Sequence, residues 1–181
     1  MAKVKNNPAP LPVQRRRKNI DLLKVEALKE PQSIYMSREA IDVLSFIGLP
    51  LKQNAGLSDS GTFLIDLIRK GIPKNAIDRL IDKIGFSEDE LAYVLHISKR
   101  TLQRRTPREV LNPEQSERII ELSKLYRKGE EVFNGLDLFK EWMNSDILSL
   151  GNKKPKEYLD TSIGISILMD ELGRIEHGIY S

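Results

Sequence analysis

The residues best suited to a defined chemistry lie close together between positions 98 and 105. Arginine can make paired hydrogen bonds to guanine, and glutamine can do the same to adenine, in the major groove of DNA. The spacing in this stretch places several such side chains on the outward side of one short helix. The candidate DNA-contacting residues are Ser98, Lys99, Arg100, Gln103, Arg104 and Arg105.

Two short helices joined by a tight turn are predicted to position these side chains. Ser87 is a suitable N-cap, and the acidic residues 88–90 complement the positive end of the first helix's dipole. Ser98 can cap a second helix that begins at Lys99. His96 occupies the turn, where glycine is usual in a helix-turn-helix, but histidine tolerates a left-handed backbone better than most residues.

The apolar residues of this stretch also favour a helix-turn-helix. The first helix has a core-facing stripe formed by Leu91, Val94 and Leu95. Ala92 is small enough for a second helix to approach closely, and Thr101 and Leu102 are expected to face inward from that helix. The alternative is an ordinary basic surface helix in a helical bundle. Because the second helix of a helix-turn-helix enters the major groove, two copies of the chain are expected to bind a two-fold symmetric site.

The amino-acid composition limits which other chemical activities the chain could have. The 181 residues include no cysteine and two histidines, so thiol chemistry is excluded and no residue spacing predicts a metal site or a cofactor. Glu176 and His177 are adjacent and would point in different directions on a helix, which makes them a poor acid–base pair. No phosphate-binding loop or nucleophile elbow is present, so no catalytic residues are predicted and an enzyme is disfavoured.

The charge and hydropathy of the chain bear on its location and partners. The formal net charge is +3, which is mildly basic. No apolar run is long enough to span a membrane, and the basic N-terminal residues are not followed by the apolar segment of a secretory signal. We therefore expect a cytoplasmic protein with no membrane contact.

The whole chain has the pattern of an all-α protein in four segments. These are a basic, proline-containing tail at 1–33, a helical segment at 34–71, the helix-turn-helix domain at 72–134 and a second helical domain at 135–181. Periodicity predicts helices at 37–47, 60–70, 74–84, 113–133, 136–143, 155–159 and 161–177, with a weaker one at 19–29. The apolar side of the last long helix is assigned to Ile163, Ile167, Leu168, Leu172 and Ile175. The tail is interpreted as solvated, or alternatively as a basic arm that touches DNA phosphates or enters a minor groove.

The C-terminal residues carry a specific likeness. The segment LGNKKPKEYLDT at 150–161 and the ending LGRIEHGIYS at 172–181 resemble the toxin-binding domain of the Xre/MbcA/ParS antitoxins. Together with the helix-turn-helix, the resemblance covers about residues 72–181, and Asn152 stands where the family often has glycine. It implies an all-helical antitoxin of a type II toxin–antitoxin pair that dimerises and binds the operator of its own operon. The partner would be a RES-domain toxin, which consumes NAD or transfers ADP-ribose.

The resemblance assigns a role to the end of the chain. On the residues alone, Arg174 and His177 complement a helix C-terminus and Gly178 caps it, which leaves Ile179 and Tyr180 without an explanation. The resemblance implies a partner-binding tail, with toxin-binding residues Arg174, Ile175, Glu176, His177, Gly178, Ile179, Tyr180 and Ser181. The resemblance also implies that the chain forms a hetero-oligomer with the toxin. The alternative function is a stand-alone transcriptional regulator whose C-terminal domain dimerises or binds a small ligand.

Overall fold

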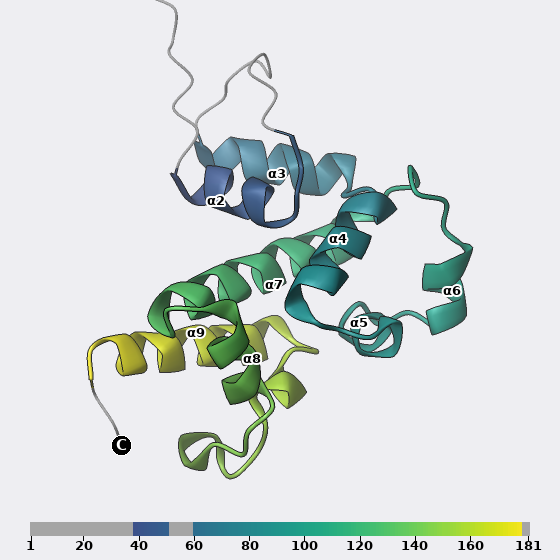
Figure 1. The fold of residues 1–181 in the computed structure, drawn as a ribbon. Coiled ribbons are helices and arrows are strands. Elements are labelled where there is room, and N and C mark those ends of the chain that lie inside the picture. Colours follow the sequence, from purple (N-terminus) through teal and green to yellow (C-terminus); the bar gives the residue numbers. More distant parts are fainter. Residues whose placement is uncertain (1–37, 51–59, 179–181) are drawn as a thin grey trace, which may run out of the picture. The chain divides into compact units, whose positions relative to one another are not determined.

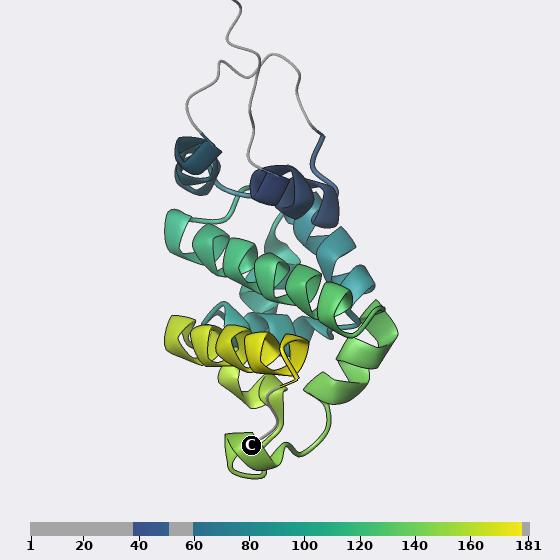
Figure 2. The ribbon, with the colours of Figure 1, turned by 90° about the vertical axis from the view of Figure 1, so that its left-hand side faces the viewer.

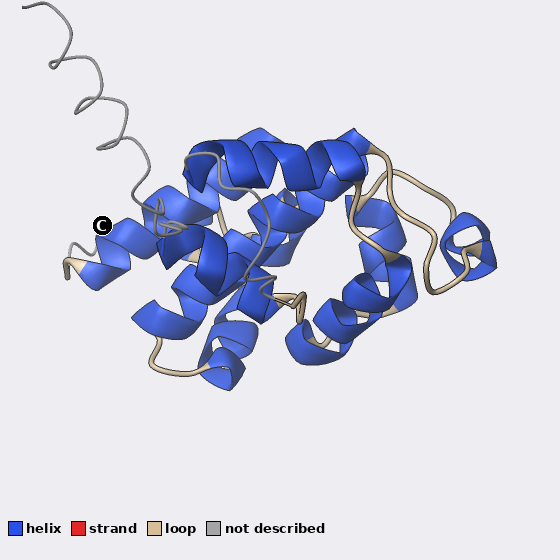
Figure 3. Cartoon of the chain, turned by 90° about the horizontal axis from the view of Figure 1, so that it is seen from above, coloured by secondary structure: helices blue, strands red, loops and turns tan. Residues whose placement is uncertain are grey.

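The computed structural model describes residues 38–50 and 60–178 (Figure 1). Its α-helices are α2 (Arg38–Phe46), α3 (Ser60–Lys70), α4 (Lys74–Ile84), α5 (Glu88–Val94), α6 (Lys99–Arg104), α7 (Pro113–Val132), α8 (Leu136–Met143) and α9 (Ser162–Glu176), and its 3-10 turns are η1 (Leu148–Leu150) and η2 (Pro155–Tyr158). Between these elements the described backbone is loop, with isolated bridges at Pro73–Val110 and Ile147–Lys153 (Figure 3). The predicted all-α fold is confirmed. The expected tail at 1–33 and the weak helix at 19–29 lie outside the described residues.

The long helix α7 is the element around which the others pack. It contacts α2, α3, α4, α8 and α9, and it lies alongside α9 (Figure 2). Asn112 caps its start by accepting a 2.8 Å hydrogen bond from the backbone N–H of Gln115, and Pro113 suits the first helical turn. The spacing of Ile119, Leu122, Tyr126 and Phe133 predicts a buried stripe on this helix. Ile119, Leu122 and Tyr126 are fully buried, and Phe133 is partly buried.

Aromatic rings join α7 to α8 and to the segment before α5. The ring of Tyr126 meets Phe86 at a centroid distance of 5.8 Å and Phe139 at 5.1 Å, both edge-on. Gly129, one turn after Tyr126, lies directly beneath the Phe139 ring, and a Cβ at this position would be 2.4 Å from that ring. The close approach of α8 to α7 therefore requires glycine at 129.

Hydrogen bonds connect the start of α4 to the loop that follows α6. The backbone N–H of Lys74 donates to the carbonyl of Glu109 at 2.9 Å, and that of Leu111 donates to Ile72 at 2.9 Å. The buried hydroxyl of Ser116 accepts a 3.1 Å hydrogen bond from the N–H of Ile72. These bonds satisfy buried backbone groups and hold the loop that returns the chain from the helix-turn-helix to α7.

Three predicted burial patterns are wrong. On α9, Ile163 and Ile167 are 75% and 38% exposed, and Ile165 is buried in their place with Leu168 and Leu172. Gly164 explains the change, because its backbone passes so close to the carbonyl of Tyr158 that a Cβ would lie 1.9 Å from the oxygen. That contact turns the side of the helix bearing Gly164 and Ile165 toward the core.

The other two corrections concern shorter helices. On α2, the spacing of Ile41, Leu44 and Ile47 predicts a buried stripe that begins at Ile41. Ile41 is exposed, and the buried stripe begins instead at Ala40 and continues through Val43 and Leu44. On α6, Thr101 is exposed and its hydroxyl lies 2.8 Å from that of Ser98. A helix of six residues buries a single side chain here, that of Leu102.

None of the helices in the described ranges is long and apolar enough to cross a membrane.

Candidate functional site

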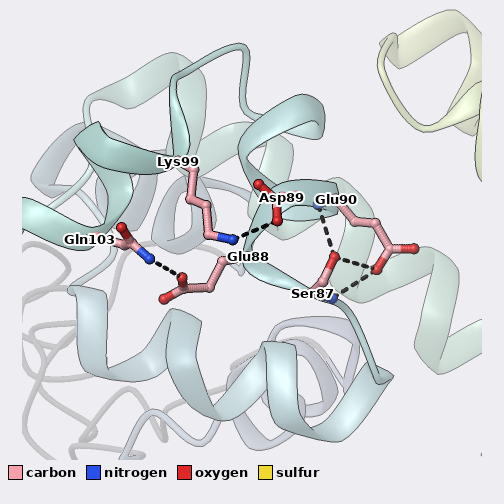
Figure 4. A network of polar contacts seen from close by, with 6 residues as sticks. All are labelled: Ser87, Glu88, Asp89, Glu90, Lys99 and Gln103. Atoms are coloured by element: carbon pink, nitrogen blue, oxygen red, sulfur yellow. Dashed lines mark hydrogen bonds and ion pairs between the residues drawn. The ribbon is translucent and has the colours of Figure 1, made fainter.

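The helix-turn-helix is built by the serine caps that the sequence predicts. Ser87 forms a capping box with Glu90, in which the serine hydroxyl accepts from the N–H of Glu90 at 3.2 Å and Glu90 accepts from the N–H of Ser87 at 2.7 Å (Figure 4). Ser98 caps α6 by accepting a 3.0 Å hydrogen bond from the N–H of Thr101. Leu102, which is fully buried, anchors α6 to the core.

The turn between the two helices depends on His96. Its φ angle is +54°, so the left-handed conformation expected at this position is confirmed. The N–H of Ile97 bonds back to the carbonyl of Ala92 at 3.0 Å and closes the turn. The His96 ring Nε2 lies 2.8 Å from the carbonyl oxygen of Asp160, which comes just before α9. Nε2 therefore carries the proton and donates.

The expected DNA-contacting side chains of α6 lie on its outer surface. Lys99, Arg100, Gln103 and Arg104 are all exposed. Arg100 and Arg104 make no ion pair or hydrogen bond within the described ranges, and with Arg105 they line a shallow recess. Two guanidinium groups are thus left facing solvent, an arrangement that suits phosphate or guanine.

Lys99 and Gln103 differ from the two arginines because carboxylates of α5 hold them. The Lys99 ammonium lies 2.6 Å from Asp89, and the Gln103 amide nitrogen donates to Glu88 at 2.6 Å (Figure 4). The hydrogen bond to Asp89 raises the pKa of Lys99 above its ordinary value. Both side chains remain on the surface.

Arg105, the last of the expected DNA-contacting residues, follows α6 directly and makes several contacts within the fold. Its side chain is 16% exposed and forms an ion pair with Glu109 at 3.8 Å. Its guanidinium donates to the carbonyl of Val110 at 2.8 Å and to the side chain of Gln115 at 3.2 Å. Arg105 thereby ties the loop after α6 to the first turn of α7.

A buried carboxylate, that of Glu171, links two segments of the C-terminal part. Glu171 of α9 accepts a 2.7 Å hydrogen bond from the hydroxyl of Ser149 in η1, and a 2.8 Å bond from Nε of Arg174. Burial raises the pKa of Glu171, but the bonds from Ser149 and Arg174 outweigh it and hold the pKa below its ordinary value. Glu171 therefore fixes the loop containing η1 against α9 and sets the direction of Arg174.

The expected toxin-binding residues are only partly described by the structure. Glu176 forms an ion pair with Lys128 of α7, with both carboxylate oxygens 2.7 Å from the ammonium. Ile175 is half-buried, and His177 and Gly178 are exposed. Ile179, Tyr180 and Ser181 lie outside the described residues.

The sequence reasoning missed a surface on α9. Helical spacing places Ile163, Ile167 and Arg174 on one face, together with Asp170 and His177. Its two isoleucines are exposed, although we expected them in the core. Gly164 was the available signal, since a glycine within a helix often marks the side on which another segment comes close.

Contacts join the helix-turn-helix directly to the C-terminal part. Besides the bond from His96, the hydroxyl of Tyr93 lies 3.4 Å from the Asp160 carboxylate. Lys156 of η2 pairs with Glu90 of α5 at 2.5 Å, and its ammonium lies 4.9 Å from the centre of the Phe86 ring. A groove beside these contacts is lined by Phe86, Tyr93, Val94 and Leu159. Residues 38–50 and 60–178 contain no group of three or more side chains arranged to hold a metal ion.

Two sequence families match this chain. The antitoxin Xre-like helix-turn-helix domain matches residues 63–124, and the antitoxin Xre/MbcA/ParS C-terminal toxin-binding domain matches residues 128–178. A protein called antitoxin Xre from Yersinia enterocolitica is 33% identical over 138 residues, which are 75% of this chain and 88% of that protein. The chain belongs to the Xre family of antitoxins.

A second antitoxin relative supports the assignment of this chain to the Xre family. An antitoxin Xre from Photorhabdus laumondii is 30% identical over 135 residues, or 73% of this chain and 91% of that protein. Among solved structures, a chain of the M. tuberculosis MbcT-MbcA toxin-antitoxin complex is 17% identical and has a TM-score of 0.45, with coverage of 60% of this chain and 96% of that one. The two family matches meet between residues 124 and 128, inside α7, so both domains share this helix.

Proposed function

We propose that this Xre-family chain inhibits a RES-domain toxin and also represses its own operon by binding the operator through α6. The match of residues 128–178 to a toxin-binding domain carries the first half of the proposal. Arg100 and Arg104 support the second half, because both are exposed and neither has a polar partner among the described residues. The protein would act by binding alone, as a dimer on DNA and as a hetero-oligomer with the toxin.

The exposed face of α9 is the surface best suited to the toxin. Ile163 and Ile167 would lose apolar surface to a partner, and burial of such surface contributes about 25 cal/mol per Å². Arg174 and His177 extend the same face toward the chain end. In this proposal the apolar residues anchor the complex, and residues 178–181 reach the toxin's NAD site.

Glu176 can contact the toxin only after it gives up its ion pair with Lys128. A toxin that handles NAD needs basic groups for the phosphates, and a carboxylate could occupy them. Glu176 must first leave Lys128, and an exposed ion pair of this kind is weak and easily broken. The exchange of one ammonium for another is therefore feasible on binding.

Substitutions on α9 test the toxin-binding surface. The toxin is taken as the neighbouring gene product that co-purifies with the full chain, and its consumption of NAD is measured with each variant. Ile163→Asp and Ile167→Asp, singly and together, are expected to weaken inhibition at least tenfold each. Ile65→Asp, at a similarly exposed isoleucine of α3, is the matched control. Inhibition by the double variant equal to that by the control would exclude this face.

The DNA-binding half is tested on α6. Alanine at Arg100, Gln103 and Arg104 should each cost about 1–3 kcal/mol if the side chain makes a bidentate base contact. If the side chain contacts a phosphate instead, its loss would weaken binding to every DNA sequence and make that binding less dependent on salt. Lys153→Ala, in a loop of the C-terminal part, is the control. Unchanged operator affinity when all three residues are replaced by alanine, or a footprint with one unrepeated half-site, would contradict the proposal.

A further inference from the structure

The first turn of α5 holds two of the side chains expected to meet the bases. The sequence suggested that residues 88–90 complement the helix dipole, but only Glu90 takes part in the capping box. Glu88 and Asp89 turn instead toward α6, where they accept from Gln103 and Lys99 at 2.6 Å each (Figure 4). Two carboxylates therefore lie beside a surface expected to face the phosphates of DNA.

Glu88 determines which way the Gln103 amide points. A carboxylate can only accept hydrogen bonds, so the amide must turn its nitrogen toward Glu88. One N–H is then used, while the second N–H and the carbonyl oxygen stay available. Adenine requires one donor for N7 and one acceptor for its N6 amino group. Gln103 held by Glu88 thus keeps the pair of groups that reads adenine and loses its freedom to rotate.

Asp89 acts on Lys99 in a different way. The pair is exposed, with 45% of the lysine and 67% of the aspartate side chain accessible, so it contributes little to the stability of the fold. Its main consequence is electrostatic. An ammonium that is neutralised by a neighbouring carboxylate releases fewer counterions from DNA, and that release is the sequence-independent part of the affinity.

We propose that Glu88 and Asp89 set the sequence discrimination of the recognition helix. Glu88 is a positioning residue that orients Gln103 toward adenine, and Asp89 lowers non-specific affinity by occupying Lys99. The inference rests on the proposed DNA-binding function of α6. It adds two acidic residues of the preceding helix to the determinants of specificity.

The test begins with the sequence preference of the full chain. Wild type and Glu88→Gln are each used to select from a pool of randomised double-stranded DNA, and the selected duplexes are sequenced. Dissociation constants are then measured over a salt series for the selected site and for a scrambled duplex. Glu131→Gln on α7 and Asp137→Asn on α8 are the controls, because they change the net charge equally at exposed positions on other helices.

Each variant has a distinct expected result. Glu88→Gln should lose the preference for adenine at one position of each half-site and reduce discrimination about tenfold, within the range of a bidentate contact. Asp89→Asn should bind both duplexes more tightly and steepen the salt slope by about 0.9, the value for one added phosphate contact. In a Gln103→Ala background, Glu88→Gln should change discrimination no further, because Glu88 acts through that side chain.

The outcomes separate this inference from the proposed function. A wild-type chain that binds no DNA overturns both. A wild type that selects a sequence, with Glu88→Gln and Asp89→Asn behaving like the two controls, overturns only the inference. The inference is also overturned if Glu88→Gln reduces discrimination in the Gln103→Ala background as much as it does in wild type. Glu88 would then not act by positioning Gln103.

Discussion

His96 of the helix-turn-helix turn donates a hydrogen bond to the backbone carbonyl of Asp160, with 2.8 Å between Nε2 and the oxygen. The same histidine has a left-handed backbone that most residues avoid. Asp160 comes immediately before Thr161, which caps α9 by accepting from the N–H of Gly164 at 3.0 Å. One side chain therefore links the turn before α6 to the entry of the helix proposed to bind the toxin.

Substitutions at His96 should separate the backbone requirement from the side-chain contact. His96→Ala and His96→Gly both lose the bond to Asp160, but glycine adopts a positive φ without the strain that alanine incurs. We expect His96→Ala to be less stable than His96→Gly by about 1 kcal/mol. Urea unfolding followed by circular dichroism measures the difference. Equal stabilities would show that the left-handed turn is not maintained in solution.

Two helical glycines are expected to respond in opposite directions to the same substitution. Gly129→Ala places a methyl group 2.4 Å from the Phe139 ring and should destabilise the chain by about 1–3 kcal/mol through overpacking. Gly173→Ala meets nothing within 4 Å and should stabilise α9 by about 0.5–1 kcal/mol. Thermal unfolding of the two variants gives the comparison. If Gly129→Ala were neutral, α8 would have to pack further from α7 than the structure indicates.

The Glu171 carboxylate predicts a dependence of stability on pH. Its pKa is lowered in the folded chain from the ordinary value of 4.5, because Ser149 and Arg174 more than offset the effect of burial. The ionised form therefore stabilises the fold fully above about pH 4.5, and this contribution is lost as pH falls through the lowered pKa. Glu171→Gln should cost about 2 kcal/mol at pH 7 and progressively less in acid.

Urea unfolding of wild type and Glu171→Gln between pH 7 and pH 3 measures this effect. Ser149→Ala removes one of the two donors to the carboxylate, so the folded pKa of Glu171 should move back toward its ordinary value. The stability lost on acidification should then be smaller than in wild type and complete at a higher pH. A constant difference between Glu171→Gln and wild type across the whole range would contradict the assignment.

Arg105 should contribute more to stability than its neighbour Arg104. Lysine at 105 keeps the charge but cannot reach Val110, Gln115 and Glu109 together, so Arg105→Lys should destabilise the chain by about 1–2 kcal/mol. Arg104→Lys, at an exposed position without such contacts, should change the free energy of unfolding by less than about 0.5 kcal/mol. Similar effects for the two variants would mean that Arg105 does not hold the loop.

Local spacing in the sequence was enough to predict the helices and their caps. Ser87 with Glu90, Ser98 with Thr101 and Asn112 with Gln115 each bond across three residues, so the pattern contains both partners. The stripe on α7 was predictable for the same reason, because the long helix repeats its buried side over several turns. The positive φ at His96 also followed from its place between the two helices.

Burial on the shorter helices was decided by the tertiary structure. Ile163 and Ile41 have the apolar character of core residues, yet both are exposed because a neighbouring segment approaches another side of the helix. On α9 that side is marked by Gly164, where Tyr158 comes closest. The composition and the spacing of apolar residues predict that a helix has a buried face. Which face is buried depends on where the neighbouring segments of the fold lie.

The polar contacts of both candidate surfaces likewise required the fold. Glu88 and Gln103 are 15 residues apart, and Lys128 and Glu176 are 48 apart, so no helical period relates them. By itself, the sequence determined the all-α class, the capped helix-turn-helix and the C-terminal motif shared with the antitoxin family, because each of these depends on residues that are close along the chain. Only the tertiary structure decided which charges are free and which are paired, because that depends on helices brought together by a common core.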